Sequence, residues 1–288
     1  MKPKISVCIV TFQRNDELLN SLYHFERSEF KEFEVLIVDN GHSTDLPARL
    51  RDAGLDLSYK LIQAPENRGC ASLNTLFEIA KGDIITCFDD DSYPNTTCLT
   101  LVWDAFKNDA ALGMIGFKMH LPDTGEAWHD SYWNPDIERP RETVLCIGCG
   151  LAFKNDRRLP ENLCIPDIVS QAHELSMAAE IARLDYKIEF HPECIAYHPN
   201  TKIGYLGAKA ENGALNQLRF LLRYADPTTL FLLRLTHWLV RLQGMPDRCR
   251  IIKEYLKKNG RSPLKRSTMR RFGEVLKWHI HPRLQRFI

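Results

Sequence analysis

The 288-residue sequence lacks features that would assign it to several large classes of protein. No apolar run reaches the ~20 residues that span a bilayer. The best candidate, residues 228–240, is interrupted by Arg234 and His237. Residues 1–4 lead straight into a strand-like run instead of a signal-peptide core. These absences favour a cytoplasmic protein, including one that works at the inner face of the cell membrane.

The cysteine and glycine patterns exclude further classes. Nine cysteines is an odd number, which indicates reduced, mostly buried thiols. Cys146 and Cys149 form one C-x-x-C pair without a second pair at zinc-finger spacing. The first strand-like run is followed neither by a glycine-rich dinucleotide fingerprint nor by a lysine-bearing phosphate loop. A dehydrogenase and a phosphate-loop ATPase are therefore disfavoured.

Charge divides the chain into two parts. Residues 201–288 contain 19 Lys and Arg against 5 Asp and Glu, whereas residues 1–200 contain 19 basic against 32 acidic residues. Helical candidates in the basic part are 216–224, 230–242, 249–258 and 265–279. We therefore expect a catalytic domain over 1–204 and a basic helical extension over 205–288. Basic amphipathic helices suit an anionic membrane surface, the acidic catalytic body or a homodimer contact. No motif indicates a nucleic-acid partner.

Strand-like and helix-like segments alternate through the first 120 residues. Apolar, β-branched runs predict buried strands at 5–11, 33–39, 57–62, 84–88 and 114–119. Helices are predicted from residue 15 and over 45–53, 70–80 and 96–108. This order predicts an α/β fold with a Rossmann-like, doubly wound and mostly parallel sheet flanked by helices.

The next 80 residues are less regular. Residues 120–142 are predicted as a long surface loop or hairpin with Trp128, His129, Tyr132 and Trp133. It forms either a lid or acceptor wall or a stacked aromatic surface patch. Gly148-Cys149-Gly150 lies between two apolar runs, and a helix is expected over 170–184 with His173 and Glu174 off its buried stripe. Residues 188–192 and 194–198 are expected as two short extended pieces.

Polar residues follow four of the predicted strands. In an open α/β sheet, ligands bind beyond the carboxyl ends of the strands. Clustered carboxylates at such an end suit Mg²⁺ or Mn²⁺, which prefer oxygen ligands. Arginine suits phosphate. The four segments are Thr11-Phe12-Gln13-Arg14, Asp39-Asn40-Gly41, Asn67-Arg68-Gly69 and Asp89-Asp90-Asp91.

These motifs, in this order, resemble the family 2 glycosyltransferases of the GT-A fold. The resemblance is strong over residues 4–120 and looser to about residue 200. It implies an enzyme that moves a sugar from a nucleoside-diphosphate sugar, with a UDP-sugar favoured, to an unknown acceptor hydroxyl with inversion. It also implies a Mn²⁺ or Mg²⁺ cofactor. The implied donor-binding residues are Thr11, Phe12, Arg14, Asp39, Asn67, Arg68, Asp89 and Asp90.

The resemblance makes Asp89 and Asp91 the two ends of an Asp-x-Asp motif. Asp91 would bind the metal directly, and Asp89 would hold the ribose or a metal-bound water. Alternation along an extended segment predicts that Asp90 points away from both. His198, in Ala196-Tyr197-His198-Pro199, lies where many relatives place a metal or diphosphate histidine. A structural histidine beside a proline turn is the alternative.

The sequence departs from the family at the general base. Relatives carry an acidic pair at the start of a helix, where this chain has Gln171 and Ala172. The predicted base is Glu174 or His173, and Asp167 is an alternative. Otherwise the base lies elsewhere or the enzyme is weak or inactive. A catalytically impaired nucleotide-sugar-binding partner is therefore the second functional hypothesis.

Overall fold

The computed structural model describes residues 2–128, 133–166, 168, 170–199, 208–233 and 260–279. The chain divides into two compact units, Met1–Gly204 and Tyr205–Ile288. The division falls where the composition turns basic. The functional roles expected for the two parts remain predictions.

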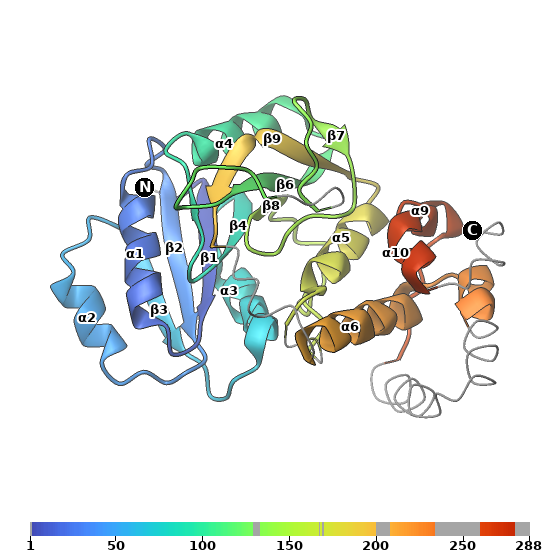
Figure 1. The fold of residues 1–288 in the computed structure, drawn as a ribbon, viewed down its shortest axis with the longest axis horizontal. Helices are drawn as coiled ribbons and strands as arrows, with labels where there is room; N and C mark the ends of the chain where they lie inside the picture. The colour runs from blue at the N-terminus through green and yellow to red at the C-terminus, as the bar shows by residue number, and fades with distance from the viewer. Residues whose placement is uncertain are drawn as a thin grey trace. The chain divides into compact units, whose positions relative to one another are not determined.

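Four parallel strands make up the first half of the sheet, in the order β3-β2-β1-β4 (Figure 1). They are β1 (Ile5–Thr11), β2 (Phe33–Asp39), β3 (Tyr59–Gln63) and β4 (Ile84–Asp89). Between them run α1 (Asn15–Glu26), α2 (Leu46–Asp52), and a 3₁₀ turn (Gly69–Ser72) that leads into α3 (Leu73–Ile79). The predicted alternation of strand and helix is confirmed here.

The second half of the sheet is mixed. Its order is β4-β8-β6-β9-β5, and β7 pairs with β9. The bounds are β5 (Tyr93–Pro94), β6 (Leu112–His120), β7 (Arg141–Glu142), β8 (Leu151–Lys154) and β9 (Lys187–Tyr197), with α4 (Cys98–Asn108) and α5 (His173–Arg183). Strand β8 is antiparallel to both β4 and β6, so the sheet is not parallel throughout, and the expected mostly parallel sheet flanked by helices is confirmed. A four-residue apolar run does not encode its direction.

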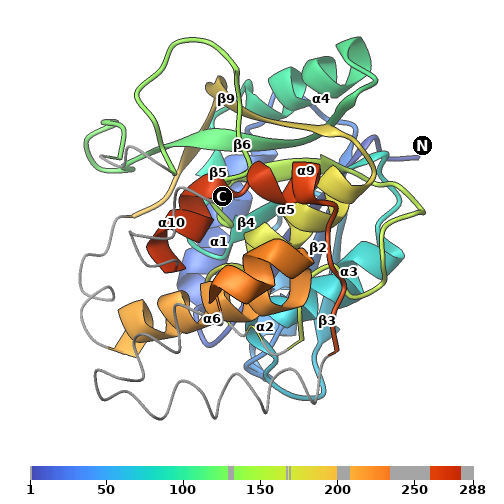
Figure 2. The same ribbon diagram turned by 90° about the vertical axis from the view of Figure 1, so that its right-hand side faces the viewer.

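Strand β9 joins the two extended pieces that the sequence predicted separately. It runs parallel to β6, and α4 packs against both strands (Figure 2). The register shifts between Phe117, which pairs with His191, and Lys118, which pairs with Ile195. The residues between these partners, Pro192 among them, form a bulge. Proline is tolerated at bulges because it cannot donate to a β-ladder.

The core explains why the strand ends carry the polar residues. Alternate residues of β1, Ile5, Val7 and Ile9, share one hydrophobic cluster with Leu18 and Phe25 of α1. Strands β1 and β2 are buried on nearly all their length. Polar side chains can therefore collect only where these strands end, at one edge of the sheet.

Helix α5 begins at His173 instead of residue 170. Gln171 and Ala172 both have left-handed backbones, with φ of 56° and 63°. Every residue of α5 from His173 to Ala182 is buried. The expectation that His173 and Glu174 lie off a buried stripe was therefore wrong. The two side chains contact each other, and this pairing offsets part of the free-energy cost of burying both polar groups.

The second unit is helical where it is described. It contains α6 (Ala208–Tyr224), a helical stretch over residues 227–233, α9 (Arg266–Arg270) and α10 (Gly273–His279). The ring of Phe220 lies 5.2 Å from those of Tyr224 and Phe272, so an aromatic cluster packs this unit. The predicted helix 249–258 lies outside the described residues. Within the described residues, no helix has both the length and the apolar character needed to cross a bilayer.

Candidate active site

The end of β4 presents three carboxylates in three environments. Asp89 is half exposed, whereas Asp90 is 5% exposed. Thr11 Oγ1 donates a hydrogen bond of 2.9 Å to Asp90, and Arg14 pairs with Asp90 at 2.9 Å and with Asp91 at 2.5 Å. Burial raises the pKa of Asp90 to about 7, although Arg14 and Thr11 oppose the shift. Asp90 thus lies beneath the site and holds Thr11 and Arg14 in place.

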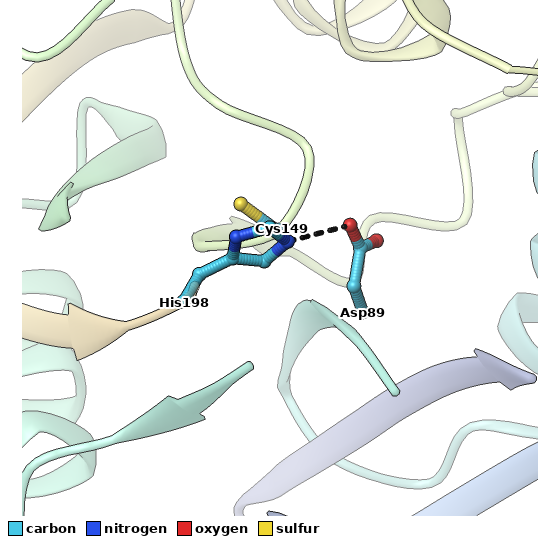
Figure 3. A group of neighbouring side chains, drawn as sticks. All are labelled: Asp89, Cys149 and His198. Atoms are coloured by element: carbon cyan, nitrogen blue, oxygen red, sulfur yellow. Dashed lines mark ion pairs between the residues drawn. The ribbon is translucent and has the colours of Figure 1, made fainter. Parts of the chain in front are cut away.

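Asp89 and Asp91 converge on His198. The imidazole Nε2 of His198 lies 3.2 Å from Asp91 Oδ1 and 3.5 Å from Asp89 Oδ2 (Figure 3). Burial opposes protonation of His198, but the two carboxylates outweigh it and raise the pKa of His198 to about 10. Burial also opposes ionisation of Asp91, but His198 and Arg14 lower its pKa to about 2. The two ends of the Asp-x-Asp motif therefore meet one histidine, while Asp90 contacts other residues.

These residues suit a divalent cation. Carboxylate oxygens and an imidazole nitrogen are common ligands of Mn²⁺ and related ions. Asp91 Oδ1 and His198 Nδ1 are buried atoms without a hydrogen-bond partner among the described residues. A cation seated between the carboxylates would satisfy Asp91 and replace the proton on Nε2. Cys149 lies at the same place, which the sequence did not predict.

The other predicted donor residues lie at the same edge of the sheet. Asp39 is fully buried and accepts hydrogen bonds of 2.7 Å from the backbone N–H groups of Gly41 and Ser43, so it shapes its own loop. Phe12 follows β1 with 45% of its surface exposed, as a base-stacking ring would need. The exposed Asn67 accepts a hydrogen bond from Gly69, and Arg68 next to it is half-buried.

His173 and Glu174 form a buried pair near this edge. His173 Nδ1 lies 3.2 Å from Glu174 Oε2. Burial opposes protonation of His173, but Cys70 and Glu174 raise its pKa to about 10. Burial raises the pKa of Glu174, and His173 opposes that shift. Asp89 is close enough to influence the pKa of both groups. The electrostatics of the two groups are thus coupled, since each opposes the effect of burial on the other.

Residues 6–153 match the sequence model of a family described as Glycosyl transferase family 2. The chain belongs to glycosyltransferase family 2. It is 31% identical over 126 residues to an uncharacterized protein of Haemophilus influenzae, a match that covers 41% of this chain and 67% of that one. It is 33% identical over 115 residues to YfnE of Bacillus subtilis, named an uncharacterized glycosyltransferase. That match covers 39% of this chain and 29% of the relative.

The fold of this family 2 glycosyltransferase is the GT-A fold. A mannosyltransferase of Pyrobaculum calidifontis, solved with GDP-Man and Mn²⁺, superposes with a TM-score of 0.53 at 19% identity. The match covers 77% of this chain and 63% of that one. At this identity the likeness concerns the fold alone. This chain thus spans less than two thirds of the mannosyltransferase and under a third of YfnE.

The structure describes residues 120–128 and 133–142 of the loop that was predicted as a lid or acceptor wall. Trp128 Nε1 donates a hydrogen bond of 3.1 Å to the carbonyl of His198, and its ring meets the His198 ring edge-on at 5.1 Å. The buried Asn134 ties the loop to β6 through the backbone of Met119. His129, Tyr132 and the alternative base Asp167 lie outside the described residues. Trp128 thus links the predicted lid to the cluster of Asp89, Asp91 and His198.

Proposed function

We propose that this protein is a metal-dependent, inverting glycosyltransferase that moves a sugar from a nucleoside-diphosphate sugar to an acceptor hydroxyl. The convergence of Asp89, Asp91 and His198 at the end of β4 carries the proposal. Asp91 and His198 would hold the cation, with Asp89 beside it. When bound, the cation would act as a Lewis acid that stabilises the departing diphosphate.

The donor would lie across the ends of β1, β2 and β4. Phe12 offers an exposed ring for the base, and the buried Asp39 and Thr11 would support the loops at the nucleoside end of the proposed site. Arg14 is held by Asp90 and Asp91, so its guanidinium is already placed next to the proposed cation. Asn67 and Arg68 would contact the sugar or the diphosphate. A UDP-sugar is the favoured donor.

Glu174 would be the general base. An inverting transfer needs a group that takes the proton from the acceptor hydroxyl. The pKa of His173 near 10 keeps it protonated at neutral pH, so it cannot accept that proton. Its positive charge instead favours the ionised form of Glu174, while burial raises the pKa of that carboxyl group and so makes its carboxylate more basic than an exposed one. His173 is therefore a positioning residue in this proposal.

Three measurements test the proposal in sequence. Nucleotide sugars are screened by thermal shift with Mn²⁺, with Mg²⁺ and with EDTA. A ligand at 100 times its Kd raises stability by about 2.7 kcal/mol. The donor found is assayed for transfer or hydrolysis, and the anomeric configuration of the product is read by NMR. Equal binding in EDTA, or a retained configuration, would contradict the proposal.

The second hypothesis is distinguished by the same experiments. Gln171 and Ala172 replace the acidic pair of relatives, and this alone favours a binding protein that has lost catalysis. Cation- and donor-dependent stabilisation without any turnover would support that outcome. For residues 205–288 we propose peripheral contact with an anionic surface, since the part is strongly basic and Phe231 is 64% exposed. Sedimentation with anionic vesicles at low and high salt tests it.

A further inference from the structure

Cys149 brings a sulfur atom to the proposed cation site. Among the described residues, the ligand atoms of Asp89, Cys149 and His198 all lie within 4.8 Å of one another. The three come from separate segments: the end of β4, the loop before β8 and the end of β9 (Figure 3). Cys149 is 5% exposed, so its thiol faces the protein and not bulk solvent. A cation site built from oxygen ligands alone has no need of a thiol at the position of Cys149.

The loop that carries Cys149 is fixed on both sides. A Cβ added to Gly148 would lie 2.5 Å from His173 Cε1, and one added to Gly150 would lie 2.7 Å from Met119 Sδ. Each glycine thus lets the main chain touch a neighbour that a side chain would push away. Because the backbone is held before and after Cys149, the position of its sulfur is set by the fold.

This donor set differs from that of a magnesium site. Carboxylate oxygen, imidazole nitrogen and thiolate sulfur are all ligands that zinc sites use. Bonds of ~2.0–2.3 Å in a tetrahedral site place the ligand atoms about 3.3–3.8 Å apart. Asp89 Oδ2 and His198 Nε2 already lie 3.5 Å apart. Mg²⁺ takes oxygen ligands in octahedral geometry, and sulfur adds nothing to its binding.

We propose that Cys149 is a sulfur ligand of this site beside His198 and the carboxylates of Asp89 and Asp91, and that the donor-free protein binds Zn²⁺ and Co²⁺ there in preference to Mg²⁺. The proposal rests on the cation site proposed above and adds a ligand and a metal preference to it. Ligands must be deprotonated to bind, so the thiol and imidazolium protons leave to solvent as the metal enters.

The test is a spectroscopic titration of the full-length, donor-free protein with Co²⁺ after removal of metal by chelation. The expected result is a sulfur-to-cobalt charge-transfer band that saturates at one Co²⁺ per chain. Zn²⁺ should abolish the band and an equal concentration of Mg²⁺ should not. Cys149→Ser should lose the band and bind Zn²⁺ at least ~10-fold more weakly. Asp89→Asn should weaken Co²⁺ binding while circular dichroism shows the same fold.

Cys194 supplies the matched control. His191, Glu193 and Cys194 form the other such group among the described residues. Cys194→Ser should keep the cobalt band. A wild-type protein without a band, or a band that survives in Cys149→Ser and disappears in Cys194→Ser, would overturn the proposal. Stabilisation by Mn²⁺ and a nucleotide sugar is measured in parallel. If wild type and Cys149→Ser show the same stabilisation, the absence of the cobalt band in wild type overturns the sulfur ligand alone. If wild type lacks it, the cation site itself is wrong.

Discussion

The two glycines around Cys149 allow a paired test of the proposed base. A Cβ added at Gly148 would lie 2.5 Å from Cε1 and 2.7 Å from Nε2 of His173. Ordinary carbon contacts are about 3.5–4.0 Å, so the imidazole or the loop must move by ~1 Å. Because His173 pairs with Glu174 at 3.2 Å, the carboxylate moves with it. A misplacement of this size can cost ~10²-fold in rate.

Gly148→Ala is therefore expected to lower kcat by ~10²-fold and to cost about 1–3 kcal/mol of stability through overpacking. Gly150→Ala is the control, because its Cβ meets the flexible side chain of Met119 at 2.7 Å. Its kcat should stay close to that of wild type. The assay is steady-state transfer from the donor found in the thermal-shift screen, alongside thermal melts and donor binding. A folded Gly148→Ala variant with wild-type kcat, or equal losses in both variants, would refute the positioning role of His173.

Three further predictions concern single side chains. Glu174→Gln should lower turnover by at least ~10²-fold with donor binding nearly intact. Glu180 is a buried glutamate on the same helix, and Glu180→Gln should not lower turnover in this way. Near-normal turnover of Glu174→Gln would reject Glu174 as the base. Asp185→Gly should raise the free energy of unfolding by ~1 kcal/mol in urea titrations. The exposed Asp185 follows α5 with a φ of 61°, a backbone conformation in which glycine is unstrained. A loss of stability would contradict this prediction. The pKa of Asp90 near 7 lies above its ordinary 3.8, so the unfolded chain binds fewer protons and stability falls as pH rises between these values. Asp90→Asn should remove up to about 3 kcal/mol of that fall between pH 5 and pH 8, where urea titrations of variant and wild type are compared. An equal loss of stability in both proteins between these pH values would count against the prediction.

The sequence predicted the first half of the fold well because local and tertiary signals agree there. The runs at 5–11 and 33–39 are apolar and β-branched, and the strands that contain them are buried on nearly all their length. The carboxyl ends of parallel strands share an edge, so the convergence of Thr11, Asp39 and Asp89 followed from topology. The strand bounds 5–11 and 33–39 agree with the structure at both ends.

The start of α5, the burial of His173 and Glu174 and the position of Cys149 were not predicted, because they depend on contacts outside the local sequence. Ser170 is a good helix start by propensity, but the left-handed Gln171 and Ala172 delay the helix to His173. The burial of His173 and Glu174 depends on their mutual pairing, which periodicity cannot show. The place of Cys149 depends on the direction of β8. A cysteine between two glycines after an apolar run was the only local signal for it.

The reversed direction of β8 has a consequence for how the acceptor side can vary. Strand β6 runs parallel to β4, since each is antiparallel to β8. The chain therefore leaves β6 at His120 and re-enters the sheet at Leu151 on the same edge that holds Asp89. Both ends of the 30-residue excursion between them lie at the proposed reaction centre, and the short edge strand β7 lies within it. Insertions or deletions outside β7 would change what lies over the proposed donor site without shifting a strand, so the acceptor could vary at little cost to the donor half.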